Sequence, residues 1–158
     1  MKITKINTTN IGRFAKSICL LLFVIAGQAQ SQTVEASDGF VRETIPGTNI
    51  SSAYMTLKNS SEKSVTLIGA SSKISPRIEI HEHSMTGGMM SMRQVDTIVI
   101  KSKDSVVLQP SGLHLMLFDI PEPLKAGDMV TITLHFSSQP DVDVQLPVKG
   151  IKRKKHHH

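Results

Sequence analysis

Two segments near the C-terminal end of the chain carry an apolar residue at every second position. Val130, Ile132, Leu134 and Phe136 alternate with Met129, Thr131, Thr133 and His135, and Val142, Val144, Leu146 and Val148 alternate with Asp141, Asp143, Gln145 and Pro147. Successive side chains of a β-strand point to opposite faces, whereas a helical pattern repeats every 3.6 residues. Each segment is therefore predicted to be an antiparallel strand with one face in the core and the other in solvent.

The same period continues from about Val34 onward, and no convincing helical stretch interrupts it. Residues 53–58 alternate in this way, residues 59–62 predict a turn, and Val65 and Leu67 continue the pattern. Further turns are predicted at Pro46-Gly47, Gly87-Gly88, Pro110-Ser111-Gly112 and Ala126-Gly127-Asp128. Several short strands at roughly regular spacing predict an all-β fold, an antiparallel β-sandwich or barrel. A chain of 158 residues is expected to form one such domain.

The N-terminal segment has the composition of a signal peptide. Residues 1–16 are basic and contain no acid, and residues 18–26 form a short apolar run, far below the ~20 residues that a spanning helix needs. We expect a signal peptide over residues 1–29, cleaved after Ala29, with Ser31 as an alternative cleavage position. The chain's single cysteine, Cys19, would leave with this peptide. The mature domain would then contain neither a thiol nor a disulfide.

Basic residues are concentrated at the two ends of the chain. Lys and Arg total 18 against 13 Asp and Glu, but four of the bases fall in residues 1–16 and four in residues 152–155, which leaves 10 bases against all 13 acids in between. The high isoelectric point therefore gives no argument for a nucleic-acid partner. We expect residues 30–150 to form the folded domain, residues 151–158 to be a disordered tail ending in histidines, and the protein to be a monomer without stable membrane insertion.

Imidazole and thioether side chains gather between residues 81 and 116. The segment contains His81, His83, Met85, Met89, Met90, Met92, His114 and Met116. These soft donors suit copper(I), whereas Mg²⁺, Ca²⁺ or Mn²⁺ would need hard oxygen ligands. The alternative interpretation is that methionines fill a core and histidines lie on a solvated strand. For a single residue that alternative is preferable, but the whole set favours a copper(I) site.

The alternation also places these donors relative to one another. Ile78 and Ile80 take the buried face of one strand, so His81 and His83 share the opposite face. A two-residue turn at Gly87-Gly88 sets Met92 directly across from His83 and diagonal to His81, with Met90 across from Met85. Further along, Leu113, Leu115 and Leu117 alternate with His114 and Met116. We expect the leucines to be buried, the donors to face outward, and closure of the sandwich to bring the two donor groups together.

The spacing of four of these donors, His81-x10-Met92-x21-His114-x-Met116, resembles that of the periplasmic copper chaperones known as the PCuAC family. The stretches 112–117, 53–56 and 123–128 also resemble the family, and the likeness extends over about residues 34–148. The resemblance implies a cupredoxin-like fold and copper(I) held by His81, Met92, His114 and Met116. Relatives often carry Met at the position of His83, which makes His83, together with Met85 and Met90, a candidate auxiliary donor.

The resemblance further implies a function. A PCuAC-type protein is a periplasmic copper(I) metallochaperone and not an enzyme, and it hands the ion to an acceptor such as the binuclear copper centre of cytochrome c oxidase. The expected partners are that copper subunit or a thioredoxin-like copper-handling protein. The tail histidines can be an auxiliary metal-collecting arm or merely a soluble end.

Three other classes compete with this interpretation. A blue-copper electron carrier needs a cysteine thiolate, which the mature chain would lack. A hydrolase needs a nucleophile with a base and an orienting acid, and no recognisable catalytic motif accompanies the Ser, His and Asp residues present. A secreted β-sandwich interaction module with a Met-rich edge remains open, and it would bind its partner equally well with and without copper.

Overall fold

The computed structural model of the protein describes residues 33–86 and 88–150. The expected signal peptide and tail lie outside these residues, as does Gly87. Ten strands form within the described part of the chain: β1 Val34–Arg42, β2 Ser51–Asn59, β3 Val65–Ser71, β4 Arg77–Thr86, β5 Met89–Gln94, β6 Ile98–Ile100, β7 Ser105–Leu108, β8 Leu113–Phe118, β9 Met129–Phe136 and β10 Val142–Lys149. Within those ranges no helix is long and apolar enough to cross a membrane.

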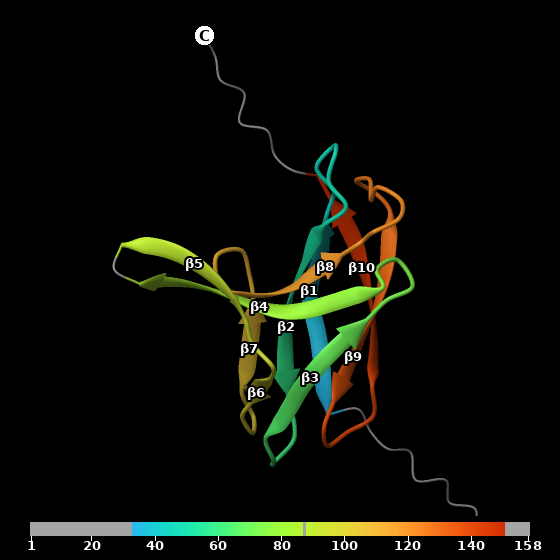
Figure 1. Ribbon diagram of the computed structural model, residues 1–158. Helices are drawn as coiled ribbons and strands as arrows, with labels where there is room; N and C mark the ends of the chain where they lie inside the picture. Colours follow the sequence, from blue (N-terminus) through green and yellow to red (C-terminus); the bar gives the residue numbers. More distant parts are fainter. Residues whose placement is uncertain (1–32, 87, 151–158) are drawn as a thin grey trace, which may run out of the picture. The chain divides into compact units, whose positions relative to one another are not determined.

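The strands form a sandwich of two sheets joined along one edge (Figure 1). The first sheet has the order β5-β4-β8-β2-β1, with β7 also pairing with β2, and the second has the order β10-β9-β3-β6. The all-β prediction is confirmed. Antiparallel pairing holds throughout except where the sheets meet, because β1 and β10 run parallel and pair only at Val41↔Val148 and Arg42↔Lys149. Parallel neighbours need a long connection, and here the whole domain lies between them.

The core lies between the sheets and follows the alternation of the sequence. In β9, Val130, Ile132, Leu134 and Phe136 are buried, and in β10 Val142, Leu146 and Val148 are buried with Val144 packed against them. The first sheet contributes Ile80 from β4 and Leu115 and Leu117 from β8. Because these residues occupy one parity of their strands, the other parity of β4 and β8 forms the outer face of the first sheet.

β2 is buried on both faces over part of its length. Ala53 and Met55 belong to the core, yet Tyr54 between them is only 6% exposed. The Tyr54 ring lies 5.1 Å from the Phe40 ring of β1 and 6.2 Å from the His114 ring of β8, both distances between centroids. An aromatic layer therefore covers the outer face of the first sheet next to β8.

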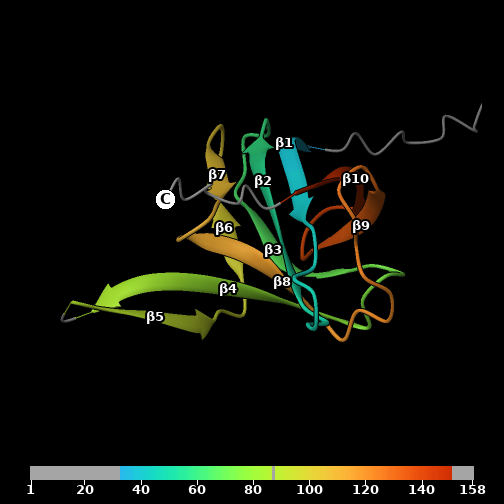
Figure 2. The ribbon, with the colours of Figure 1, turned by 90° about the horizontal axis from the view of Figure 1, so that it is seen from above.

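The hairpin of β4 and β5 extends away from the other strands, as both ribbon views show (Figures 1 and 2). β4 pairs with β8 from Arg77 to Glu82 and with β5 from His81 onward, so its C-terminal part, beyond Glu82, pairs only with β5. All six residues of β5 are exposed. The end of this hairpin is therefore a two-stranded arm that adds nothing to the core.

Candidate metal centre

The β4–β5 hairpin has the register that a two-residue turn requires. His83 pairs directly with Met92, Met85 with Met90, and His81 with Gln94. The predicted register is therefore confirmed, although Gly87 of the turn is not among the described residues. Side chains of paired residues lie on the same face, so His81, His83 and Met92 share one face of the hairpin.

The second group of donors lies beside the first because β8 pairs with β4 in the same sheet. His81 pairs with His114, and Glu79 pairs with Met116. The expectation that sandwich closure would bring the two groups together is wrong. The sheets close at β1 and β10, whereas the donors meet by lateral pairing of β4 between β5 and β8. We call His81, His83, Met92, His114 and Met116 the soft-donor face.

His114 lies on the expected face of β8 but is not exposed there. Its exposed fraction is 3%, because three rings surround it: His83 at 5.0 Å, His81 at 6.0 Å and Tyr54 at 6.2 Å between ring centroids. The alternation along β8 predicts which face of the sheet His114 occupies, but it does not predict that rings from β2 and β4 cover the His114 side chain. The correction matters chemically, since a buried imidazole resists protonation.

The orientation of the His114 ring is fixed by the turn that precedes its strand. Nδ1 of His114 lies 3.0 Å from the carbonyl oxygen of Gly112, which can only accept, so Nδ1 carries the proton and the Nε2 lone pair is free. The same carbonyl accepts the backbone N–H of His83 at 3.2 Å and so connects the two strands. Burial, chiefly, lowers the pKa of His114, and nearby His83 and His81 lower it further. A neutral imidazole with one free lone pair is the form that binds a metal ion.

His81 is oriented by a carboxylate. Its Nε2 lies 2.8 Å from Oε2 of Glu79, and Oε1 of Glu79 accepts from Nη1 of Arg77 at 2.7 Å. The hydrogen bonds from His81 and Arg77 hold the pKa of Glu79 below its usual value, so Glu79 is an ionised acceptor. With its proton on Nε2, His81 has a bare lone pair on Nδ1. This nitrogen is buried and has no hydrogen-bond partner.

Nδ1 of His83 is also buried without a partner. Buried polar atoms in folded proteins are nearly always hydrogen-bonded, so two such nitrogens on adjacent positions of one face call for a physical account. A bound metal ion provides one, because it accepts the lone pairs that no donor reaches. The unpartnered nitrogens of His81 and His83 and the free Nε2 of His114 are therefore candidate donors to a metal ion.

The two thioethers differ in exposure, since Met116 is partly buried and Met92 is exposed. Met92 is 49% exposed, and Sδ of Met116 accepts a 3.5 Å hydrogen bond from Oγ of Ser52. In the described part of the chain no three His, Cys, Asp or Glu side chains are grouped so as to hold a metal ion. A complete ligand set on this face therefore has to include sulfur from methionine, which favours copper(I) over ions that prefer oxygen.

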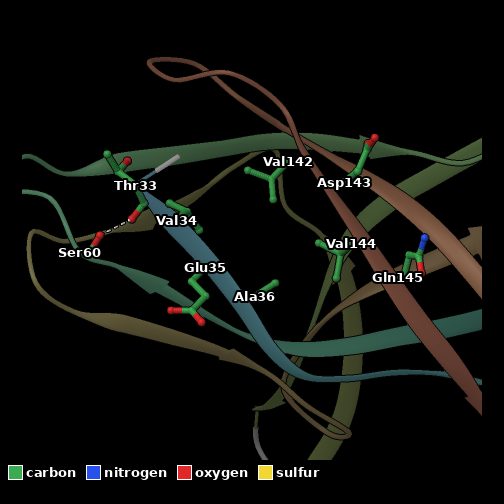
Figure 3. Close-up of a pocket in the computed structure, with 9 residues that line it drawn as sticks. All are labelled: Thr33, Val34, Glu35, Ala36, Ser60, Val142, Asp143, Val144 and Gln145. Carbon is green, nitrogen blue, oxygen red and sulfur yellow. Dashed lines mark hydrogen bonds between the residues drawn. The ribbon is translucent and has the colours of Figure 1, made fainter. Parts of the chain in front are cut away.

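A cavity of about 500 Å³ lies elsewhere, where β1 and β10 diverge below their short parallel pair. Thr33, Val34, Glu35, Ala36, Ser60, Val142, Asp143, Val144 and Gln145 line it (Figure 3). Ser60 closes one end by donating from Oγ to the Thr33 carbonyl at 3.0 Å. None of the lining residues is His or Met, so this cavity offers no soft donor.

The structure also contains a Ser–His–Asp arrangement that the sequence did not indicate. His135 contacts Oδ2 of Asp141 through Nδ1 and Oγ of Ser71 through Nε2, both at 2.8 Å. His135 lies on β9, Ser71 ends β3 and Asp141 directly precedes β10, and pairing in the second sheet brings them together. They lie on its solvent face, and none of them lines a described cavity. Acyl transfer also needs a bound substrate and donors for an oxyanion, so this arrangement alone does not make a hydrolase.

The domain is an all-β sandwich that carries imidazole and thioether side chains together on the outer face of its first sheet, which fits the class of domains that bind a soft metal ion. Residues 34–148 match the family described as LpqE-like lipoproteins, a family of the PCuAC type, and the chain belongs to it. A curated relative, Lxx21020 of Leifsonia xyli subsp. xyli, is 28% identical over 121 residues, which are 76% of this chain and 72% of that protein.

Solved structures of PCuAC domains share the fold. The apo form of DR1885 from Deinococcus radiodurans is 31% identical, with a TM-score of 0.60 over 78% of this chain and 83% of that one. The copper(I) form of DR1885 is 29% identical, with a TM-score of 0.59 over 78% and 85%. The copper-bound PCuAC domain from PmoF2 has a TM-score of 0.65 over 76% and 95%, and at 22% identity it supports the cupredoxin-like fold alone.

Proposed function

We propose that this protein binds one copper(I) ion on the soft-donor face and transfers it to an acceptor protein outside the cytoplasm. The observation that carries the proposal is the set of free imidazole nitrogens, Nδ1 of His81 and Nε2 of His114, on directly paired positions of β4 and β8. Met92 and Met116 supply the two thioethers. DR1885, which is similar over most of this chain, has a copper(I)-bound form.

This ligand set suits transfer as well as binding. Two imidazoles and two thioethers give a soft environment without thiolate, so copper(I) is preferred and copper(II) is held more weakly. Met92 is half exposed at the rim, and an acceptor can therefore replace its sulfur first while the imidazoles still hold the ion. Stepwise replacement of ligands lets the ion pass without being released into water.

His81 is the principal ligand of β4 in this proposal, and His83 is auxiliary. His83 pairs directly with Met92, and its ring lies nearer to the His114 ring than that of His81 does, at 5.0 Å against 6.0 Å. However, the Glu79 carboxylate fixes the ring of His81, and a ligand that is already oriented loses less freedom on binding. His83, with Met85 and Met90 further along the hairpin, then assists capture or release.

The acceptor and the location are inferred from the family resemblance. We propose that the domain of residues 30–150 acts in the periplasm as a monomer, after removal of residues 1–29, and without catalysing a reaction itself. The lipoprotein names of the family and of Lxx21020 also support a location outside the cytoplasm. The proposed acceptor is the binuclear copper centre of cytochrome c oxidase, reached directly or through a thioredoxin-like copper-handling protein.

The proposal can be tested by competition for copper(I) against a chromophoric chelator. His81→Ala and His114→Ala should each lower the affinity at least about tenfold, or ~1.4 kcal/mol, and His83→Ala should lower it distinctly less. His135→Ala is the matched control, because His135 lies on the second sheet, and it should leave the affinity unchanged. Equal affinities in wild type and His114→Ala would contradict the proposed site. A larger loss in His83→Ala than in His81→Ala would reverse the order of the two ligands.

A further inference from the structure

The outer part of the β4–β5 hairpin exposes an unusual amount of methionine. Met85 is 67% exposed, Met89 75%, Met90 62% and Met92 49%. Between His81 and Gln94 every large apolar side chain is a methionine. An arm that served only as an apolar docking surface would be equally well made from leucine, isoleucine or phenylalanine. The exclusive use of thioethers therefore points to sulfur chemistry.

The register arranges these thioethers in a definite way. Met85 pairs directly with Met90, and the next pair on the same face is His83 with Met92. Same-face pairs along a strand are about 6.8 Å apart, a distance that flexible methionine side chains can span from both ends. Met89 pairs with Thr86, one position further, and so lies on the opposite face of the arm. The donors of one face thus form a continuous series from the exposed Met85–Met90 pair to the buried His114.

We propose that Met85 and Met90 form a second, weaker copper(I) site that loads and unloads the soft-donor face. The inference rests on the proposed function, because it adds an outer position to the same path. Two thioethers hold copper(I) weakly by themselves, and Met92 of the neighbouring pair can supply a third. The ion then advances by exchange of ligands, leaving Met85 and Met90 as His83 and the inner imidazoles bind. Copper stays in the +1 state throughout, and no covalent bond of the protein changes.

The test compares leucine variants that keep size and apolar character. All are made in the full chain with Cys19, His156, His157 and His158 replaced by serine, so that neither a thiol nor the tail histidines bind copper(I). Met85→Leu/Met90→Leu removes the outer pair. Met89→Leu is the matched control on the opposite face of the same arm, and Met129→Leu is a control on β9, where the side chain is 61% exposed. Two readouts are used: the methionine methyl signals by NMR during a copper(I) titration, and the rate of copper(I) uptake from a chelator.

In the parent chain we expect the Met92 and Met116 methyl signals to shift with the first equivalent and those of Met85 and Met90 with a second, weaker one. Met85→Leu/Met90→Leu should lose the second step, keep the first within about twofold in affinity, and take up copper(I) at least about fivefold more slowly. The two controls should behave as the parent. The inference would be overturned if the second binding step survived in the double variant. It would also be overturned if the Met85 and Met90 signals of the parent chain never moved, and the arm would then be a docking surface only. Failure of the first equivalent to shift Met92 and Met116 would instead contradict the proposed function.

Discussion

The rings of His81 and His114 are oriented by different means. His114 is buried and donates from Nδ1 to the carbonyl of Gly112 in the turn before β8, so its orientation depends on that turn. His81 depends on the side chain of Glu79, which Arg77 holds in turn while lying 3.9 Å above the Phe118 ring. Of the two proposed ligands, His81 is therefore the one whose orientation a single side-chain change can disturb.

Glu79→Gln should weaken copper(I) binding without unfolding the domain. The amide keeps the shape of the carboxylate but removes the charge that favours a proton on Nε2 of His81, so Nδ1 presents its lone pair less often. Loss of a carboxylate behind a metal-bound histidine reduces metal affinity by roughly 10-fold or more. Chelator competition measures the affinity, and ¹⁵N NMR of the His81 ring reports its tautomer. The control is Glu122→Gln in an exposed loop. Unchanged affinity together with an altered tautomer would show that the orientation of His81 is unimportant.

The buried state of His114 makes the stability of the copper-free protein depend on pH. Burial holds the pKa of His114 below its ordinary value near 6.5, so the unfolded chain takes up this proton more readily than the folded one. The contribution to stability is therefore complete above pH 6.5 and is lost as the pH falls through the lowered pKa. Urea unfolding between pH 7.5 and pH 5 should show a decreasing free energy of unfolding. His114→Phe should reduce this slope, and an identical slope in the variant would refute the assignment.

At the scale of elements, sequence patterns predicted local pairing and failed on distant pairing. The alternation of residues 129–136 and 141–148 predicted β9 and β10, and the Gly87-Gly88 turn was sufficient to place His83 opposite Met92. Nothing local indicates that β8 pairs with β4, or that β1 and β10 run parallel, because such neighbours are chosen by the packing of the whole core. The donors could thus be named from the sequence, but not the lateral pairing that unites them or the burial of His114.

The turn after β2 depends on a single buried side chain. Asn59 is fully buried, its amide nitrogen lies within 3.1 Å of the carbonyl oxygens of Lys63, Ile100 and Lys101, and its oxygen accepts from the backbone N–H and hydroxyl of Ser61. It therefore holds the 59–62 turn against the end of β6. The sequence identified this turn but not its anchor, because asparagine is common in exposed turns as well.

Asn59→Ala should lower the free energy of unfolding by about 3 kcal/mol. The carbonyl groups that Asn59 now contacts would remain buried without this donor. Each buried acceptor without a donor costs about 1–3 kcal/mol of stability, before water or local movement compensates for the loss. Urea denaturation of the copper-free protein measures the change, and Asn49→Ala in an exposed loop is the control, with an expected effect within about 0.5 kcal/mol. Copper(I) affinity should stay unchanged, since Asn59 lies outside the soft-donor face. A loss below about 1 kcal/mol would mean that the turn relaxes to recover its hydrogen bonds.

At the scale of the whole molecule, the core and the soft-donor face are separate. Within residues 33–86 and 88–150 the core contains 22 buried apolar residues, none of which belongs to the proposed ligand set, and it lies on the opposite face of the first sheet from the donors. Sheet closure through β1 and β10 likewise uses no proposed ligand. A binding site built on a finished scaffold is already organised before the metal arrives, which distinguishes this domain from small zinc domains that fold only on binding.

The copper-free domain should therefore fold by itself, and copper(I) should stabilise it only by mass action. Circular dichroism without metal should give a β-sheet spectrum with a cooperative thermal transition. Copper(I) at 100 times its dissociation constant should then raise the free energy of unfolding by about 2.7 kcal/mol, which for a domain of this size raises the midpoint by roughly 10 °C. His114→Ala should fold but show little of this increase, and His135→Ala should show all of it. A copper-free spectrum typical of random coil, becoming β only on addition of copper(I), would mean that the ligands take part in folding and that the core alone is insufficient.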